Sequence, residues 1–119
     1  MKQFDVITAM KVLRKINDVA SLPCTISYRF YKLTCQLQHY WDWQINEEQK
    51  LYEKFGTMNE QGDYEFTPEN KTALTNAIVD ISQTEVENDW DIIYIPITDD
   101  LHISANDIKS LQGFVNFIE

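Results

Sequence analysis

Residues 23–55 read PCTISYRFYKLTCQLQHYWDWQINEEQKLYEKF, with no glycine and no second proline after Pro23. Apolar side chains recur through this run at spacings of three or four residues, the period of one helix face: Ile26, Phe30, Leu33, Leu37, Trp41, Ile45 and Tyr52. Proline suits the first turn of a helix, and Gly56 stands where a left-handed C-cap is expected. The pattern predicts one long helix over about 23–55, a rod of about 48 Å.

A first helix is predicted on the N-terminal side, from about Asp5 to Val19, before the break at residues 21–23. Its apolar stripe follows the helical period: Val6, Met10, Leu13, Ile16 and Ala20. We expect this helix to fold back on the N-terminal half of the long one and form a helical hairpin. The distal half, residues 44–55, then projects or is covered by the C-terminal segment.

The C-terminal half predicts two shorter helices and a small strand. A turn at 57–63 and a short extended piece at 64–66 lead to a helix over about 68–83, capped by Thr67, with core positions at Leu74, Ile78 and Ile81. Residues 85–97 alternate between acidic and apolar side chains, and a strand is predicted within them at about 90–95, with 64–66 as its one local partner. Ser104 and Asp107 form a capping box, which predicts a final helix over about 105–117.

These elements predict a single domain, residues 1–119, of α+β class and mostly helical. Hydrophobic residues make up 44% of the 119 residues, which is too apolar for intrinsic disorder. No apolar run approaches the roughly 20 residues of a membrane span, and the N-terminus lacks the apolar core of a secretory signal. Cys24 and Cys35 are too far apart on a helix to form a disulfide, so two free thiols and a cytosolic protein are expected.

The net charge is −9 and is unevenly distributed. Residues 1–35 hold six basic and two acidic side chains, whereas residues 36–119 hold four basic and seventeen acidic ones. Such an acidic surface repels nucleic acid, which excludes a general nucleic-acid binder. It could attract a basic partner protein, or it could serve solubility alone.

The sequence predicts no enzyme, no metal and no cofactor. Cys35, His39 and Asp42 share a helix face and could approach one metal ion, but structural zinc usually takes four ligands and no second pair is present. Glycine loops that bind phosphate and nucleophile elbows are also missing from the sequence.

Two surfaces are predicted to contact a partner. The first is the aromatic part of the long helix, because Tyr, Trp and Arg dominate binding hot spots: Arg29, Tyr31, Tyr40 and Trp43. Its alternative is intramolecular cover by the final helix. The second is an acidic row whose carboxylates would point to one side of a strand, as in a DNA mimic: Glu85, Glu87, Asp89 and Asp91. Its alternative is a solvent face that protects a sheet edge.

The order of these features resembles a group of small acidic proteins of tailed bacteriophages and prophages, mostly of unknown function. The resemblance rests on short stretches along most of the chain: Ala9–Ile16, Leu22-Pro23 with Tyr28–Leu33, Lys54–Gly56 with Asn59–Tyr64, Thr84–Glu87, and Ile95–Ile97 before Leu101–Ile108. Asn106 departs from it, because Pro is expected before the acid of the last cap.

The resemblance implies a phage origin and an accessory role, with no catalytic residues. The predicted function is a non-enzymatic accessory protein that binds another phage or host protein, in virion assembly, in the host cytoplasm or on the virion. The alternative is an inhibitor of host defence that binds a nuclease or CRISPR effector as an acidic DNA mimic. A homodimer would also hide surplus aromatic surface.

Overall fold

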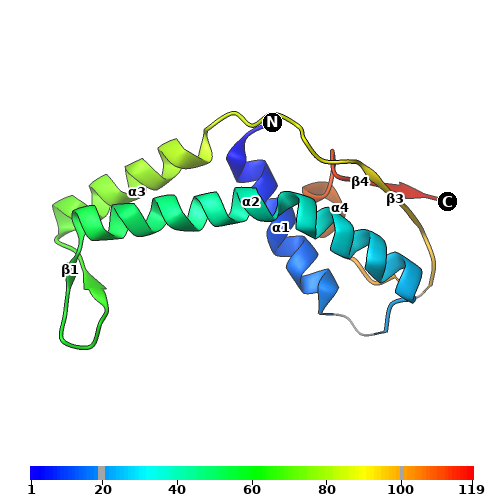
Figure 1. Cartoon of the computed structure of the whole chain (residues 1–119), viewed down its shortest axis with the longest axis horizontal. Coiled ribbons are helices and arrows are strands. Elements are labelled where there is room, and N and C mark those ends of the chain that lie inside the picture. The colour runs from blue at the N-terminus through cyan, green and yellow to red at the C-terminus, as the bar shows by residue number, and fades with distance from the viewer. Residues whose placement is uncertain (19–20, 100) are drawn as a thin grey trace.

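The computed structural model of the chain describes residues 1–18, 21–99 and 101–119. Its elements are, in order, α1 (Gln3–Asn17), α2 (Cys24–Phe55), β1 (Thr57–Met58), β2 (Tyr64–Glu65), α3 (Pro68–Ser82), β3 (Ile93–Pro96), α4 (Ala105–Ser110) and β4 (Val115–Ile118). The fold is mostly helical α+β, as predicted, and its 32-residue helix α2 runs along a molecule of 51 × 31 × 23 Å (Figure 1). None of the helices in the described ranges combines the length and the apolar character that crossing a membrane requires.

The predicted hairpin of α1 and the N-terminal half of α2 is confirmed, and it forms most of the core. The predicted apolar positions of α1 and of the N-terminal half of α2 are buried: Val6, Met10, Leu13, Ile16, Ile26, Phe30, Leu33 and Leu37. Burying one such large aliphatic or aromatic side chain contributes roughly 1.5–3 kcal/mol. Farther along α2 the predicted stripe is not buried, because Ile45 is exposed and Trp41 and Tyr52 are half-buried. Val19 and Ala20, predicted to continue the first helix, lie outside the described residues.

The predicted final helix over 105–117 is wrong in its second half. The helix α4 ends at Ser110, and residues 115–118 form β4 instead. Gly113 has a φ of +88°, which lies in the left-handed region and ends any helical path. The N-cap was predicted correctly, because the Ser104 hydroxyl accepts a hydrogen bond from the Asp107 amide at 3.1 Å.

The strand β3 pairs in parallel with β4, from Ile93 opposite Val115 to Pro96 opposite Ile118. The predicted partner, residues 64–66, is therefore wrong; β2 pairs with β1 in a separate antiparallel hairpin. The buried Trp90 ring fixes the C-terminal segment beside β3. It stacks on Phe114 with centroids 4.8 Å apart, and its Nε1 donates to the Gly113 carbonyl oxygen at 3.1 Å.

The acidic row was predicted to lie on a strand, and this is also wrong. Strand structure begins only at Ile93; upstream, Glu85 makes an isolated antiparallel bridge with Lys2. Residues 86–92 belong to no strand, and the side chains of Gln36 and Tyr40 on α2 bind the backbone of this segment instead.

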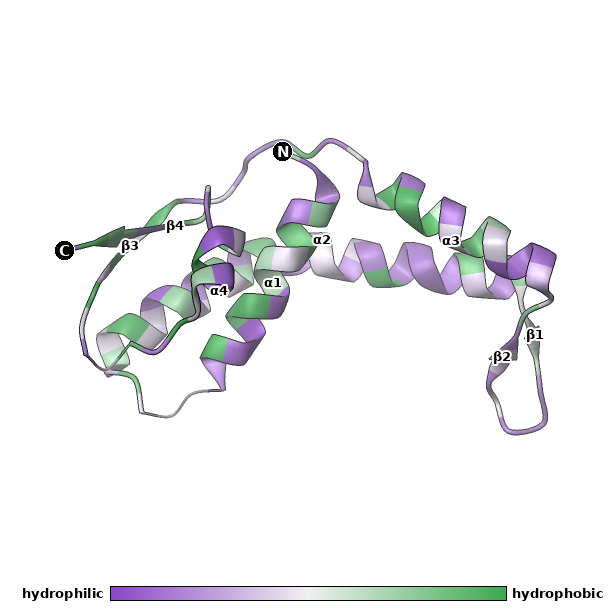
Figure 2. Ribbon diagram, turned by 180° about the vertical axis from the view of Figure 1, so that it is seen from behind, coloured by the Kyte–Doolittle hydropathy of each residue, from purple (hydrophilic) through white to green (hydrophobic). Residues whose placement is uncertain are grey.

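The distal half of α2 projects from the hairpin, and α3 folds back along it with the β1–β2 hairpin at the far end (Figure 1). We call this part, residues 44–82, the arm. Its residues are largely hydrophilic along α2 (Figure 2). Of the predicted core positions, Leu74 is buried and Ile78 and Ile81 are half-buried. Thr67 caps α3 as predicted, by accepting a hydrogen bond from the Asn70 amide at 3.2 Å.

Gly56 does not form the predicted left-handed C-cap, because its φ is −104° and its backbone is extended. A side chain there would still clash. A Cβ atom would lie 2.7 Å from the Tyr52 carbonyl oxygen and 2.8 Å from the Phe66 ring. Glycine is therefore required at this junction because Tyr52 and Phe66 approach its backbone closely, and not because of a positive φ.

Candidate functional site

The acidic segment, residues 84–91, runs along α2 and is bound by polar side chains of that helix (Figure 1). The Gln36 amide accepts from the Asp91 backbone N–H at 2.8 Å and donates to Asp91 Oδ2 at 3.2 Å. Four residues on, the Tyr40 hydroxyl lies 2.7 Å from the Glu87 carbonyl oxygen and 2.8 Å from Asp89 Oδ1, and shares its proton between them. The predicted aromatic and acidic surfaces are thus joined.

Tyr40 stays protonated over the physiological range. Burial, the hydrogen bond to Asp89 and the negative charges of Asp89 and Glu87 together raise the pKa of Tyr40 to about 12, with burial the largest cause. Its ring also meets Trp90 edge-on, with centroids 5.8 Å apart. The hydroxyl is therefore a permanent donor that holds the acidic segment against α2.

His39 also reaches the acidic segment, with Nε2 lying 3.1 Å from Asp89 Oδ2. Both side chains are more than half exposed, so the pair contributes little to stability even when the imidazole is protonated. Its effect is to place an aromatic ring beside the carboxylates.

A groove of about 380 Å³ opens where α2 meets the start of the acidic segment. It is lined by Gln3, His39, Tyr40, Trp43, Thr84, Glu85, Val86 and Glu87. We call it the aromatic-acidic groove. Aromatic rings come from α2 and carboxylates from the opposite segment. Trp43, with 40% of its surface exposed, is the largest accessible ring among the lining residues.

Four of the eight predicted contact residues line this groove: Tyr40, Trp43, Glu85 and Glu87. Asp89 adjoins it through Tyr40 and His39. Gln3 was not among the residues predicted from the sequence, although this side chain sets the position of α1 at the groove. This side chain is 1% exposed, and its Nε2 donates to the Tyr40 carbonyl oxygen at 2.9 Å. The one signal for Gln3 in the sequence is that a polar residue stands at the start of the apolar stripe of α1.

The other three predicted residues lie elsewhere. Arg29 donates from Nη1 to the Tyr94 carbonyl oxygen at 2.9 Å, and so fixes β3 to α2. Tyr31 is 59% exposed, and a side-chain hydrogen bond with Cys35 raises the pKa of its hydroxyl. Asp91 is bound by Gln36.

The acidic row does not form an even file of carboxylates. Asp89 and Asp91 are each bound by side chains of α2, and Glu85 lies 3.4 Å from the amino group of Met1. Glu87 contributes its backbone carbonyl to Tyr40. This geometry differs from the regular strand that the DNA-mimic interpretation assumed.

No metal-binding cluster of three or more His, Cys, Asp or Glu side chains occurs within residues 1–18, 21–99 and 101–119. The imidazole of His39 faces Asp89, and does not join Cys35 and Asp42. Cys24 and Cys35 are both free and exposed.

The groove has the chemistry of a cation site. A Lys or Arg side chain is attracted to the face of a Trp or Tyr ring and forms charge-assisted hydrogen bonds with carboxylates. The described lining includes both of these partners and no basic residue apart from His39. In comparisons with known proteins, no protein family, no curated protein and no solved structure matches this chain.

Proposed function

We propose that the protein is a non-enzymatic, phage-encoded accessory protein that binds a basic segment of another protein in the aromatic-acidic groove. The observation that carries this proposal is the shared lining of one groove by Trp43 and Tyr40 from α2 and by Glu85 and Glu87 from the facing segment. The phage origin is supported by the sequence resemblance.

The charge distribution supports a basic partner. Residues 36–119, which supply nearly all of the groove, hold seventeen acidic and four basic side chains. This surplus would steer a basic protein toward the groove at low ionic strength. Contact with a ring adds roughly 0.5–1 kcal/mol at an exposed site, and about 2 kcal/mol when the cation loses its water.

Virion assembly is the role we favour, with a phage structural protein as the partner. The uneven arrangement of the acidic row weakens the DNA-mimic form of the alternative, although the acidic surplus of residues 36–119 on which the alternative also rests is unchanged. An inhibitor of a host nuclease or CRISPR effector would instead bind a basic loop of the enzyme in the same groove. The two roles therefore differ in the identity of the partner and not in the chemistry of contact.

Affinity capture from infected cells with matched variants tests the proposal. Trp43→Ala and Glu87→Gln alter the groove, whereas Tyr28→Ala removes an exposed ring of α2 outside it. We expect a phage structural protein bound to the wild type and to Tyr28→Ala, and strongly reduced with both groove variants at unchanged helicity.

If partner binding survives both groove substitutions, the groove is not the binding site and the proposal is contradicted. If the captured protein is a host nuclease or defence effector, and its binding is lost with the two groove variants, the inhibitor role would replace the role in virion assembly. Recovery of this chain alone would favour the homodimer.

A further inference from the structure

The sheet of β3 and β4 has two edges, and the edge along β3 is closed. This sheet lies at the end of the molecule opposite the arm (Figure 1). Arg29 donates to the Tyr94 carbonyl oxygen at 2.9 Å, on the side of β3 that faces away from β4. Pro96 has no N–H group to offer a further strand. A charged side chain and a proline are both devices that keep an edge strand from pairing.

The edge along β4 is open. The Ile97 N–H donates to the Ile118 carbonyl oxygen at 2.8 Å, so Ile118 faces β3 with its backbone groups. Backbone direction alternates along a strand, and the N–H and C=O of Phe117 therefore point away from β3. So do the C=O of Val115 and the N–H of Glu119. None of the described residues forms a backbone hydrogen bond with these outward groups.

The composition of β4 does not protect this edge either. Residues 111–118 read LQGFVNFI and contain no charged side chain and no proline. Short segments of high β-propensity and low charge pair readily with copies of themselves. The Phe117 ring is only half-buried, on the face of the sheet that packs against the core. A strand added along β4 would cover the rest of it.

We propose that β4 pairs antiparallel with β4 of a second copy of this chain, around a two-fold axis at Phe117. In an antiparallel pair, directly opposite residues of the hydrogen-bonded type exchange both of their backbone bonds. The two Phe117 residues form such a pair, and the Val115 C=O of each copy accepts from the Glu119 N–H of the other. Every outward group then has a partner. The two Phe117 rings lie opposite each other, and cross-strand aromatic pairs stabilise sheets.

Pairing with a second copy stops at two chains. It produces a sheet in which both outermost strands are β3, and Arg29 and Pro96 close those edges. An interface around a two-fold axis uses the same surface of both copies, so no open edge remains for a third. A sheet of two strands is marginal on its own, and additional strands stabilise it.

The net charge of −9 on each copy opposes self-association, but little of that charge lies at this edge. Glu119 is the one charged side chain within residues 111–119. In the proposed register the two Glu119 residues lie at opposite ends of the pair, about 13 Å apart along the strands. Their repulsion is largely screened, because the Debye length is about 8 Å at physiological ionic strength.

This interface leaves the aromatic-acidic groove free, because no residue of β3 or β4 lines that groove. The proposal therefore does not depend on the proposed function. It also differs from a dimer that hides the aromatic surface of α2, since that dimer would cover Trp43.

Sedimentation equilibrium of the full chain over a range of concentrations tests the proposal. We expect a mass that rises from 14.0 kDa toward twice that value and no further. Added salt should strengthen self-association, because it screens the repulsion between two acidic copies, whereas it should weaken binding of a basic segment in the groove. A monomer at every concentration up to the millimolar range, or growth beyond a dimer, would overturn the proposal.

Two substitutions at Phe117 separate backbone pairing from the contribution of the ring. Phe117→Pro and Phe117→Ala both remove the ring, but only proline also removes the outward N–H. Proline is tolerated in an edge strand where the N–H faces solvent, so both variants should keep the helicity of the wild type. We expect Phe117→Ala to dimerise at higher concentration than the wild type and Phe117→Pro to stay monomeric. Equal self-association of the two variants would contradict pairing through the backbone.

Disulfide cross-linking checks the register without a proline. Cys24 and Cys35, both exposed, are first replaced by serine. In that background Phe117→Cys should give covalent dimers on mild oxidation, because hydrogen-bonded opposite residues have Cα atoms about 5.5 Å apart. Asn116→Cys is the matched control, because position 116 lies opposite Ile118 of the second copy and is too far from its own equivalent. Equal cross-linking by the two variants would refute the register.

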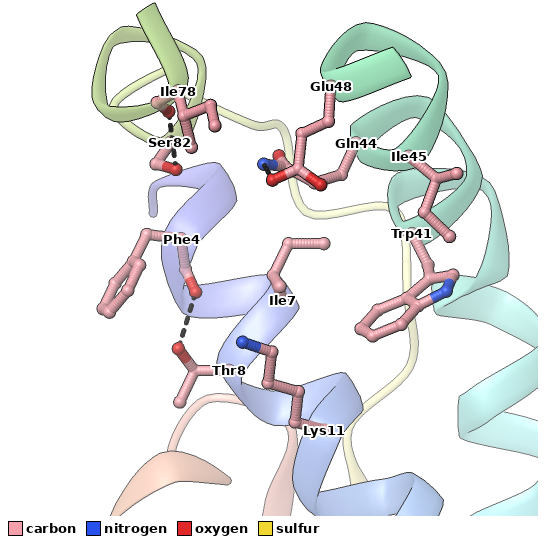
Figure 3. Close-up of a pocket in the computed structure, with 10 residues that line it drawn as sticks. All are labelled: Phe4, Ile7, Thr8, Lys11, Trp41, Gln44, Ile45, Glu48, Ile78 and Ser82. Atoms are coloured by element: carbon pink, nitrogen blue, oxygen red, sulfur yellow. Dashed lines mark hydrogen bonds between the residues drawn. The ribbon is translucent and has the colours of Figure 1, made fainter. Parts of the chain in front are cut away.

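Exposed apolar side chains elsewhere provide the last control, because they can also mediate association. Phe4 and Ile45 border a cavity of about 240 Å³ where α1, α2 and α3 meet, and both are about half exposed (Figure 3). Ile45→Gln reduces this apolar surface without a change in charge, and Trp43→Ala reduces the aromatic surface of α2. Both variants should dimerise as the wild type does. Loss of the dimer with either one, at unchanged helicity, would place the interface outside β4 and overturn the proposal.

Discussion

The Tyr40 hydroxyl lies 2.8 Å from Asp89 Oδ1, across 49 residues of sequence. This contact joins the aromatic helix to the acidic segment, and a second bond to the Glu87 carbonyl oxygen at 2.7 Å strengthens the junction. The aromatic surface of α2 and the acidic segment were predicted as two separate surfaces. Because of this contact they form the walls of one groove.

Tyr40→Phe should lower the free energy of unfolding by about 1 kcal/mol, because one hydroxyl loses its bonds to Glu87 and Asp89 at a partly solvated site. The ring stays in place, so the loss should be local. Denaturant unfolding measures the free energy, and amide hydrogen exchange should become faster in residues 85–91. Unchanged exchange in that segment would show that Tyr40 does not hold it.

Tyr40 also predicts how the free energy of unfolding depends on pH. Folding raises the pKa of Tyr40 from 10.0 to about 12, so the folded state holds this proton more tightly than the unfolded state. The resulting stabilisation is fully present below pH 10 and is lost as the pH rises through about 12.

Denaturant unfolding at several pH values between these limits checks the prediction. The fall in stability should be smaller in Tyr40→Phe than in the wild type. Tyr28→Phe is the control, because Tyr28 is an exposed tyrosine of the same helix and should behave as the wild type does. Identical pH profiles for Tyr40→Phe and the wild type would refute the assignment.

Gly113→Ala distinguishes the observed C-terminal strand from a continued helix. At a φ of +88° an added Cβ strains the backbone, and it would also meet the Met1 side chain at 2.8 Å. We expect a loss of about 1 kcal/mol or more. Were residues 105–117 helical, the same change would stabilise the protein by roughly 1 kcal/mol. The sign of the change in unfolding free energy, from chemical denaturation, decides between the two.

The arm should open more readily than the hairpin of α1 and α2. Its helix α3 buries only Leu74, whereas α1 buries seven residues. Regions with few buried apolar contacts exchange their amide protons by local opening. Hydrogen exchange should therefore be faster in α3 than in the middle of α1. Equal protection in the two helices would show that the arm unfolds only with the whole molecule.

The helices could be predicted because their signals are local. The stripe through Val6 and Leu13 and the stripe through Phe30 and Leu37 follow the helical period, and each was buried as the period requires. The caps at Thr67 and Ser104 are formed by residues within three positions. No distant contact was needed to place these elements.

The C-terminal strand could not be predicted, because its apolar residues fit two periods. Leu111, Val115 and Ile118 suit a helix face, whereas Val115 and Phe117 suit one side of a strand. The decision comes from distant contacts, the stack of Trp90 on Phe114 and the pairing with β3. Parallel pairing leaves no hairpin signal in the sequence.

The sequence selected four of the eight residues that line the candidate site, but not their assembly into one groove. Tyr40, Trp43, Glu85 and Glu87 were chosen for two surfaces, by hot-spot composition and by acidic alternation. Their meeting depends on how the acidic segment returns along α2, which no local pattern encodes. Arg29 has the same composition signal, yet it binds the Tyr94 carbonyl oxygen and supports the fold.

The central claim is that the aromatic-acidic groove takes a basic segment. It is tested most directly by a nuclear magnetic resonance titration of the full chain with acetyl-Gly-Lys-Lys-Gly amide, which contains no guanidinium. We predict saturable shifts of the Trp43 indole and of the amides of residues 84–87, weakened by Glu87→Gln and by added salt. Shifts spread over exposed acids such as Glu53 and Glu60, without saturation at Trp43, would contradict the account.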